Sequence, residues 1–362
     1  MERMKVKARG GSYEVVMGGG AWSAFRELES KDFSRTFILT ERGIWKRWGK
    51  IFLRASGLKE PRVIFIRPGE RTKVLGTAEQ VALELLRARA DRKSLLVAFG
   101  GGVVGDLGGF VASIYMRGID YLQAPTTIVA QVDSSIGGKT GVDAGPMKNL
   151  LGTFYPPGLV LAEPRVLESL RPRAFRSGLY EMIKHGILAG SPLFEELEAK
   201  IPRASPEQAK SLEGILVQAA RVKVEIVSHD ERESGMRRLL NLGHTFGHAL
   251  EEATGYRRLL HGEAVGWGLL AAVKLGERLG LLGSNEAERM ARLVRSTGPL
   301  PSIRDLRADE VIALTASDKK TVAGRVRWIV PQGIGKVTIV ADVPPADAAE
   351  ALADVQRARW GG

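Results

Sequence analysis

The sequence predicts two domains, an α/β half over residues 1–163 and a mainly helical half over residues 164–362. In the first half, short apolar runs alternate with stretches of helical spacing, which is typical of a parallel sheet flanked by helices. In the second half, apolar residues recur at helical spacing and β-branched runs are rare. A chain of 362 residues is long enough to form two hydrophobic cores.

Four short apolar runs in the first half have the length and composition of buried strands. They cover residues 36–40, 62–66, 94–99 and 126–131, and a further edge strand is expected over 13–17. Over residues 72–92, Val74, Ala78, Val81 and Leu85 fall on one helical face. Strands alternating with helices in this way predict an α/β domain.

The second half begins after a stretch rich in proline, which suits a linker: Pro156, Pro157, Gly158 and Pro164. Helices are expected over residues 174–190, 206–228, 241–254, 262–280 and 284–296. A late hairpin is expected from the β-branched runs 325–330 and 336–340.

The composition narrows the class of protein. The chain has no Cys, which excludes a disulfide scaffold, thiolate metal sites and a Cys nucleophile. No apolar run approaches ~18 residues and Met1–Arg9 lacks an apolar core, so we expect a cytoplasmic protein without a membrane partner. The net charge of +12 suits either nucleic acid or anionic small molecules. Because the basic residues are scattered and aromatics make up only 6%, we expect no nucleic-acid partner.

Two glycine-rich loops are candidate binding sites. Residues 100–109 read GGGVVGDLGG after a predicted strand, and Gly100, Gly102 and Gly105 fit G-x-G-x-x-G. Such glycines let the backbone approach a pyrophosphate at a helix N-terminus, although a glycine-rich turn without a ligand is the alternative. The second loop, GGKT at 137–140, lacks the P-loop glycine because position 133 is Asp, so Lys139 is expected to bind a phosphate or carboxylate instead.

A Glu/His constellation in the second half has the composition of a catalytic zinc site. His244 and His248 share one helical face, His261 begins the next helix and Glu181 lies on an earlier one. One carboxylate and two imidazoles leave coordination positions open for catalysis. A zincin would use both His244 and His248, but position 245 is Thr rather than the Glu base. Histidines of a core or a helix cap are the alternative.

Together these motifs resemble the 3-dehydroquinate synthase family. The matching segments are PGERTK (68–73), GGGVVGDLGGFVASIYMRG (100–118), PTTIVAQVDSSIGGKTGVD (125–143), KNLLGTFYPP (148–157), SGLYEMIKHGIL (177–188), LNLGHTFGHALE (240–251), HGEAVGWG (261–268) and DKK (318–320). The resemblance implies an N-terminal α/β dinucleotide-binding domain followed by a mainly α-helical metal-binding domain, in a homodimer.

The resemblance also assigns roles to residues. It implies that Glu181, His244 and His261 bind a divalent metal, zinc or cobalt. The implied NAD contacts are Glu70, Lys73, Gly102, Val103, Val104, Gly105, Asp106, Thr126, Thr127, Lys139, Lys148 and Ser169. The implied substrate and catalytic residues are Arg117, Asp133, Lys139, Asn149, Lys184, Lys223, Arg237, Asn241, His248 and, of the two DKK lysines, Lys319.

The implied reaction converts 3-deoxy-D-arabino-heptulosonate 7-phosphate to 3-dehydroquinate and phosphate in the shikimate pathway. It proceeds by transient oxidation with NAD, phosphate elimination, re-reduction and an intramolecular aldol step. Another sugar-phosphate cyclase and a glycerol-1-phosphate-type NAD/zinc dehydrogenase are the alternatives. Asp143, Met147 and Tyr180 depart from the residues expected in the family pattern, as does FYPP where FYQP is usual.

Overall fold

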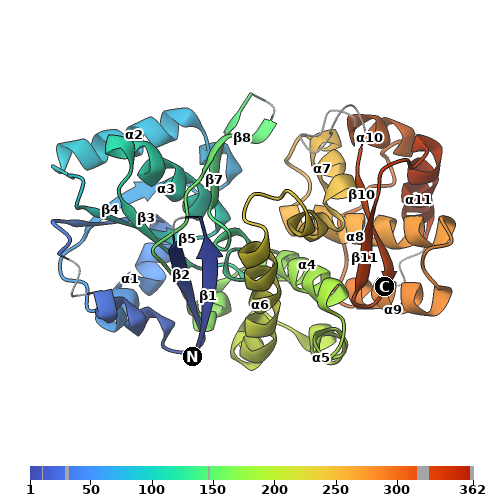
Figure 1. Cartoon of the computed structure of the whole chain (residues 1–362), viewed down its shortest axis with the longest axis horizontal. Coiled ribbons are helices and arrows are strands. Elements are labelled where there is room, and N and C mark those ends of the chain that lie inside the picture. Colours follow the sequence, from blue (N-terminus) through green and yellow to red (C-terminus); the bar gives the residue numbers. More distant parts are fainter. Residues whose placement is uncertain (10, 29–31, 146, 316–325, 359–362) are drawn as a thin grey trace. The chain divides into compact units, whose positions relative to one another are not determined.

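A computed structural model describes residues 1–9, 11–28, 32–145, 147–315 and 326–358 (Figure 1). The chain forms two compact units: unit 1 comprises Met1–Leu170 and Ala209–Arg232, and unit 2 comprises Arg171–Gln208 and Glu233–Gly362. This division starts unit 2 close to the boundary expected after residue 163, but it groups 209–232 with the first unit. The predicted fold class is confirmed: the first unit is α/β and the second is mainly helical.

Unit 1 is built on a seven-stranded sheet with the order β1-β2-β9-β6-β5-β3-β4. The pairs are parallel except for β1–β2. Its strands are β1 (Glu2–Ala8), β2 (Gly11–Met17), β3 (Thr36–Glu41), β4 (Arg62–Ile66), β5 (Leu95–Gly100), β6 (Asp120–Pro125) and β9 (Leu159–Ala162). Central parallel strands are apolar on both faces, which is why the sequence identifies β3 and β5 as continuous apolar runs.

The helices of unit 1 complete its core. They are α1 (Arg42–Ser56), α2 (Leu75–Arg87), α3 (Gly102–Ile114) and α6 (Glu213–His229). Helix α6 packs against the edge strand β1. The Lys7 N–H donates to the Ser228 hydroxyl at 3.1 Å, and the Arg9 N–H donates to the Glu231 carboxylate at 2.7 Å. These contacts cover an otherwise open sheet edge and explain why this late segment belongs to the first unit.

The strand predicted over 126–131 is wrong. Strand β6 ends at Pro125, and Ala130–Ser134 forms a short π-helix. The run of Thr, Ile and Val has the composition of a strand, but the Thr127 hydroxyl accepts the N–H of Ala130 at 3.2 Å, as a helix cap does. The local capping bond therefore outweighs the β-branched composition.

The sequence also missed a hairpin made of β7 (Lys139–Ala144) and β8 (Met147–Phe154). Gly141 and Gly152 lie opposite each other in its register. A Cβ on Gly152 would lie 2.4 Å from the carbonyl oxygen of Thr140, so the two strands approach where neither residue has a side chain. Glycines and exposed side chains hide the alternation that normally indicates a strand.

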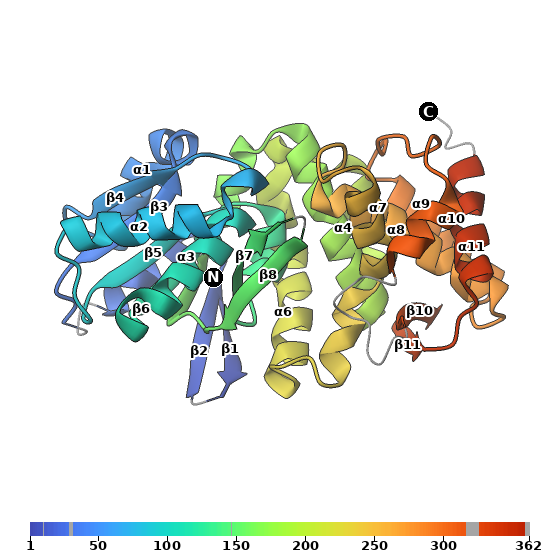
Figure 2. The same ribbon diagram turned by 90° about the horizontal axis from the view of Figure 1, so that it is seen from above.

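Unit 2 is organised around one buried helix. Its helices are α4 (Pro172–Ala189), α5 (Leu193–Lys200), α7 (His244–Ala253), α8 (His261–Arg278), α9 (Ser284–Arg295), α10 (Ala308–Leu314) and α11 (Pro345–Arg357), with a hairpin of β10 (Trp328–Gly333) and β11 (Lys336–Val340). Helix α8 packs against α4, α7, α9, α11 and β10 (Figure 2). Because it is covered on several sides, it is apolar or small nearly all round.

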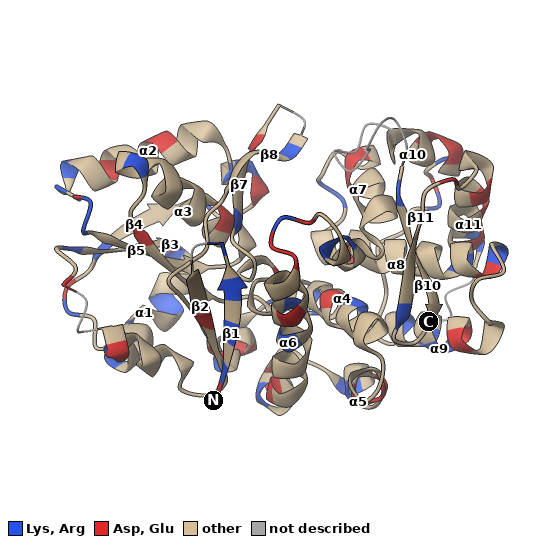
Figure 3. Ribbon diagram, viewed as in Figure 1, with Lys and Arg blue, Asp and Glu red and all other residues tan. Residues whose placement is uncertain are grey.

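The helices predicted for the second half are largely confirmed, with two shifts of boundary. The stretch predicted over 206–228 is a 3₁₀ turn at Pro206–Leu212 followed by α6. The stretch predicted from 241 begins its α-helix at His244, because Gly243 has a φ of 78°. Among the described residues, no helix is long and apolar enough to span a membrane. Basic and acidic residues are interspersed on the helices of both units (Figure 3).

Candidate active site

In unit 2, glycines let α4, α7 and α8 approach one another closely. A Cβ on Gly262 of α8 would lie 1.7 Å from the carbonyl oxygen of Ser177 on α4, far inside contact distance. A Cβ on Gly268 would lie 1.9 Å from the carbonyl oxygen of Gly243, which precedes α7. Side chains at the facing turns of the three helices are therefore brought into one small volume.

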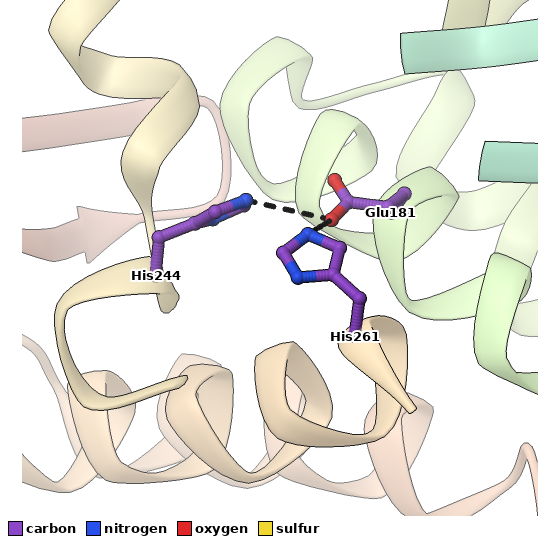
Figure 4. A group of neighbouring side chains, drawn as sticks. All are labelled: Glu181, His244 and His261. Atoms are coloured by element: carbon purple, nitrogen blue, oxygen red, sulfur yellow. Dashed lines mark ion pairs between the residues drawn. The ribbon is translucent and has the colours of Figure 1, made fainter. Parts of the chain in front are cut away.

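Glu181, His244 and His261 converge in that volume from α4, α7 and α8 (Figure 4). The Nε2 atoms of His244 and His261 lie 3.5 Å and 3.4 Å from the same carboxylate oxygen, Oε1 of Glu181. Ligand atoms about 2.0–2.1 Å from a tetrahedral zinc ion lie roughly 3.3–3.4 Å apart. The two distances to Glu181 thus match the edges of a tetrahedral metal site, and all three ligand atoms lie within 4.8 Å of one another.

The second nitrogen of each imidazole also faces an acceptor. His244 Nδ1 lies 3.2 Å from the carbonyl oxygen of Leu242, and His261 Nδ1 lies 3.3 Å from Oε2 of Glu251. Each Nδ1 is therefore placed to donate its proton, which leaves the Nε2 lone pair directed at the shared centre. This donor set fits a divalent metal better than it fits core histidines.

The charges around the centre favour a cation. Burial lowers the pKa of His261, but Glu251 and Glu181 more than offset this and raise it to about 10. The Lys184 ammonium lies 2.5 Å from Oε2 of Glu181, and both side chains are buried. A buried carboxylate is stable only with positive charge beside it. The groups placed around Glu181 to supply that charge are the Lys184 ammonium and the site between the two imidazoles.

Of the further predicted substrate residues of unit 2, His248 lies next to this centre. The His248 ring lies 5.5 Å from that of His244 and 6.2 Å from that of His261, measured between centroids. Arg237 is buried in the 3₁₀ turn before α7, and the Asn241 amide donates to the Glu233 carboxylate. Lys319 lies outside the described residues.

In unit 1, the predicted nucleotide loop occupies the point where the strand order reverses. Strand β3 pairs with β4 on one side and with β5 on the other, so the crevice at the carboxyl ends of β3 and β5 is a topological switch point. Strand β5 ends at Gly100, and α3 begins at Gly102. The N-terminus of α3, including Val103 and Val104, therefore lies where open α/β sheets bind their ligands.

Several glycines of this loop serve packing rather than ligand approach. A Cβ on Gly100 would lie 2.4 Å from Cγ2 of Val104, and one on Gly105 would lie 2.5 Å from Oε1 of Gln123. Gly101 faces Thr127 instead, with 3.0 Å between its Cβ position and Cγ2 of Thr127. The Thr126 N–H donates to the Gly100 carbonyl at 2.9 Å, so both predicted threonines lie beside the loop.

A charged cluster adjoins α3. The Lys73 ammonium is buried and lies 2.9 Å from the Glu70 carboxylate and 3.1 Å from that of Asp106. Burial lowers the pKa of Lys73, but Asp106 and Glu70 outweigh it and raise the pKa overall. Burial raises the pKa of Asp106, while Lys73 opposes the rise. The structure thus brings Glu70, Lys73 and Asp106 into one network.

A second ion pair of unit 1 joins Lys223 on α6 to Asp133 on the π-helix, at 2.9 Å. The charge of Lys223 also lowers the pKa of Asp106, against the larger effect of burial. The Lys223–Asp133 pair and the Lys73–Asp106 pair are therefore close enough to interact electrostatically within unit 1.

The β7–β8 hairpin carries three predicted site residues, Lys139, Lys148 and Asn149. Asn149 has a φ of 49°, and its N–H donates to Oδ1 of Asp143 at 2.7 Å. The Asp143 N–H in turn donates to the carbonyl oxygen of Lys73 at 2.7 Å. Asp143, which departs from the family pattern, therefore ties the start of β8, which carries Lys148 and Asn149, to the charged cluster.

Two further predicted residues of unit 1, Arg117 and Ser169, have other surroundings. Arg117 follows the C-terminal end of α3, a helix about 20 Å long, so it lies at the far end from the nucleotide loop. It sits in a run of positive φ angles, 48° at Met116, 69° at Arg117 and 121° at Gly118. The Ser169 hydroxyl accepts the indole N–H of Trp48 at 2.8 Å and donates to the Val166 carbonyl at 2.8 Å.

The structure adds three candidates that sequence reasoning missed. Glu41 ends β3 at the switch point, and burial raises its pKa. It lies beside the glycine loop only because β3 pairs with β5, so the sequence held no spacing signal that could have identified it. Glu251 follows His244 by seven residues, and Glu233 contacts Asn241 across eight. The i, i+4, i+7 spacing of His244, His248 and Glu251 was readable in the sequence.

Tyr180, another departure from the family pattern, has a packing role. A Cβ on Gly266 would lie 2.8 Å from its ring, so the ring lies flat over a glycine of α8. The hydroxyls of Tyr180 and Thr297 are 2.5 Å apart. Burial raises the pKa of Tyr180 to about 12. The larger side chain fills space that the glycine leaves open.

Comparisons with known proteins identify relatives of this chain over most of its length. Residues 63–177 match the family model described as 3-dehydroquinate synthase N-terminal, and residues 178–321 match the one described as 3-dehydroquinate synthase C-terminal. The chain is 43% identical to a 3-dehydroquinate synthase of Solibacter usitatus, over 94% of this chain and 95% of the relative. It is 42% identical to one of Koribacter versatilis, over 98% of both chains.

Solved structures show the same fold. A 2-epi-5-epi-valiolone synthase from Streptomyces hygroscopicus subsp. jinggangensis, with NAD⁺ and Zn²⁺ bound, has a TM-score of 0.85 at 29% identity, covering 95% of this chain and 96% of that one. A 2-deoxy-scyllo-inosose synthase has a TM-score of 0.85 at 22% identity, covering 98% and 99%. With two family models together spanning most of its length and relatives above 40% identity, the chain belongs to the 3-dehydroquinate synthase family.

Proposed function

We propose that the protein converts 3-deoxy-D-arabino-heptulosonate 7-phosphate to 3-dehydroquinate and phosphate, as an NAD- and metal-dependent carbon–oxygen lyase of the shikimate pathway. The observation that carries this proposal is the convergence of Glu181, His244 and His261, with both Nε2 atoms within 3.5 Å of one carboxylate oxygen. The family membership supports the choice of reaction.

In this proposal Glu181, His244 and His261 hold the divalent metal, zinc or cobalt. NAD is held by the switch point of unit 1: the N-terminus of α3, Thr126 and Thr127, and the cluster of Glu70, Lys73 and Asp106. When bound, the metal supplies Lewis acidity toward substrate oxygens, and NAD supplies a reversible hydride acceptor.

The chain's own side chains bind and orient the substrate. The substrate carries a carboxylate and a phosphate, and Lys184, Lys223 and Arg237 supply fixed positive charge for them. Arg237 is buried, and a buried guanidinium binds a planar or tetrahedral anion in two-pronged fashion. Asn241, Asn149, Lys139, Arg117 and Lys319 are proposed as further contacts.

His248 is the residue that we assign to proton transfer. It lies one turn after His244 on α7 and its ring is next to the metal-binding imidazoles. It is half-buried, so it can reach both substrate and solvent. An imidazole has a pKa suited to accepting and returning protons near neutral pH.

The central experiment incubates the purified protein with the heptulosonate phosphate, NAD and zinc. We expect stoichiometric release of phosphate, formation of 3-dehydroquinate and no accumulation of NADH. NADH accumulating with glycerol 1-phosphate would favour the dehydrogenase alternative. Turnover of sugar phosphates that lack the carboxylate, without turnover of the heptulosonate, would favour another cyclase.

A pair of variants tests the metal assignment. Glu181→Ala or His261→Ala is expected to lose bound zinc and, with it, phosphate release. Glu195→Ala, which removes an exposed carboxylate from α5 of the same unit, is the matched control and should keep both. Full activity and full zinc content in either ligand variant would contradict the assignment.

We also propose a homodimer. Support comes from apolar side chains that unit 1 leaves exposed, namely Ile114, Met116, Leu150, Leu151 and Phe154. Strand β8 lies against α3, so these side chains belong to neighbouring elements. Sedimentation at micromolar concentration is expected to give twice the mass of the chain, and Leu150→Glu is expected to weaken association. A cytoplasmic location stays a prediction of the sequence.

A further inference from the structure

Glu251 is a buried carboxylate beside the metal-binding imidazoles, and the proposed reaction gives it no role. It is 1% exposed and lies on the face of α7 that also carries His244 and His248. Its Oε2 atom lies 3.3 Å from Nδ1 of His261, which comes from a different helix. A buried carboxylate is costly without compensation, so its position against this nitrogen needs a physical reason.

The two imidazoles of the centre are held differently. His244 Nδ1 faces the carbonyl of Leu242, two residues away, and its side chain is 10% exposed. His261 is the first residue of α8, and its side chain is 35% exposed. Packing therefore restrains the His244 ring, whereas the His261 ring depends more on directional contacts.

The His261 ring has one carboxylate at each nitrogen. Nε2 lies 3.4 Å from Oε1 of Glu181 on α4, and Nδ1 lies 3.3 Å from Oε2 of Glu251 on α7. An acceptor at Nδ1 selects the tautomer whose proton is on Nδ1 and whose lone pair is on Nε2. The same carboxylate also adds negative charge next to the centre, and this favours a doubly charged metal over a proton.

We propose that Glu251 is a positioning residue for metal binding: it holds the His261 ring through Nδ1, so that Nε2 is the atom that ligates the metal. This inference rests on the proposed metal-binding function. Outer carboxylates of this kind typically change metal affinity by about 10–100-fold.

The test measures zinc affinity by competition with a chromophoric chelator, in wild type, Glu251→Gln, Glu251→Asp and Glu252→Gln. Glu251→Gln keeps the shape of the side chain, and Glu251→Asp keeps its charge but shortens its reach. Both are expected to raise the zinc Kd about 10–100-fold. Glu252→Gln, one residue further on the same helix and only partly buried, should stay within about twofold of wild type.

Cobalt-loaded protein gives a readout that a purely structural role would not move. At saturating Co²⁺, the visible absorption of Glu251→Gln should differ from wild type, because the His261 ligand is reoriented, while that of Glu252→Gln should match. Unfolding midpoints measured in the presence of a metal chelator identify any variant that is simply misfolded. The zinc affinities of Glu251→Gln and Glu251→Asp serve as checks on each other.

Three results would overturn the inference. Unchanged zinc affinity in both Glu251→Gln and Glu251→Asp would remove any role toward the metal. Wild-type affinity in Glu251→Asp with weak binding in Glu251→Gln would assign the effect to charge alone. Two zinc ions per wild-type chain and one in Glu251→Gln would make Glu251 a ligand itself. Wild-type protein that binds no divalent metal would instead contradict the proposed function.

Discussion

Helix α3 of unit 1 and helix α8 of unit 2 both use glycine to approach neighbouring segments, but the closest contacts of the two helices differ in kind. In unit 1, Cβ atoms on Gly105 and Gly109 would meet the side chains of Gln123 and Thr140, at 2.5 Å and 2.4 Å. In unit 2, Cβ atoms on Gly262 and Gly268 would meet backbone carbonyl oxygens at 1.7 Å and 1.9 Å. Side chains can rotate away, whereas a helix backbone must move as a whole. The metal centre should therefore tolerate substitution less well than the nucleotide loop.

The largest effect is expected from Gly262→Ala. The new Cβ would push α8 away from the turn of α4 that precedes Glu181, so His261 would move off the centre. We expect a loss of stability of at least about 3 kcal/mol and a zinc affinity reduced more than 100-fold. Chemical denaturation and chelator competition measure the two effects. Gly283→Ala, where a Cβ meets nothing within 4 Å, is the control.

A second large effect is expected from Lys73→Met in unit 1. The change leaves the Asp106 and Glu70 carboxylates without their buried ammonium. Removing one partner of a buried pair costs about 3–5 kcal/mol, and the double variant with Asp106→Asn should recover part of it. The measurement is a denaturation cycle of the two single variants and the double variant. Strictly additive effects would show that the pair does not act as a unit.

Gly109→Ala tests whether the two units are separable. A Cβ there meets Cγ2 of Thr140 and the Tyr121 ring, so α3 must shift against β7 and β6. We expect about 1–3 kcal/mol of destabilisation and weaker NAD binding, with zinc affinity unchanged. Titration calorimetry with NAD and with zinc measures the two affinities. Gly76→Ala on α2 has open space and should stabilise by about 0.5–1 kcal/mol. Loss of zinc in Gly109→Ala would contradict the comparison.

The smallest effect is expected from Tyr180→Phe. It keeps the ring over Gly266 and removes only the hydroxyl next to Thr297. A loss of about 1 kcal/mol in stability is expected, without change in zinc affinity or kcat. Tyr180→Ala, which also removes the ring, should cost about 3–5 kcal/mol. Equal stability of the two variants would show that the ring does not fill the space over α8.

Local sequence patterns were enough to predict many of the helices and strands. Burial of one or both faces of an element produces a pattern of apolar residues that are close together in the sequence. This pattern predicted the apolar runs of β3, β4 and β5 and the helical spacing of α2, α4 and α8. The strand prediction for residues 126–131 is wrong because their composition is that of a strand, whereas a capping hydrogen bond at Thr127 decides their conformation. The β7–β8 hairpin was not predicted, because the two strands approach each other at glycines, which contribute nothing to an alternating side-chain pattern.

The sequence by itself determined the fold class, the glycine loop after a strand, and the residue types of the metal centre, because these depend on composition and short spacing. Only the tertiary structure decided which residues meet: that α6 covers β1, that Arg117 lies at the far end of α3, and that Glu251 faces His261. The last of these contacts depends on how closely α7 and α8 approach. That distance is set by glycines facing backbone atoms from distant parts of the chain, which no local pattern records.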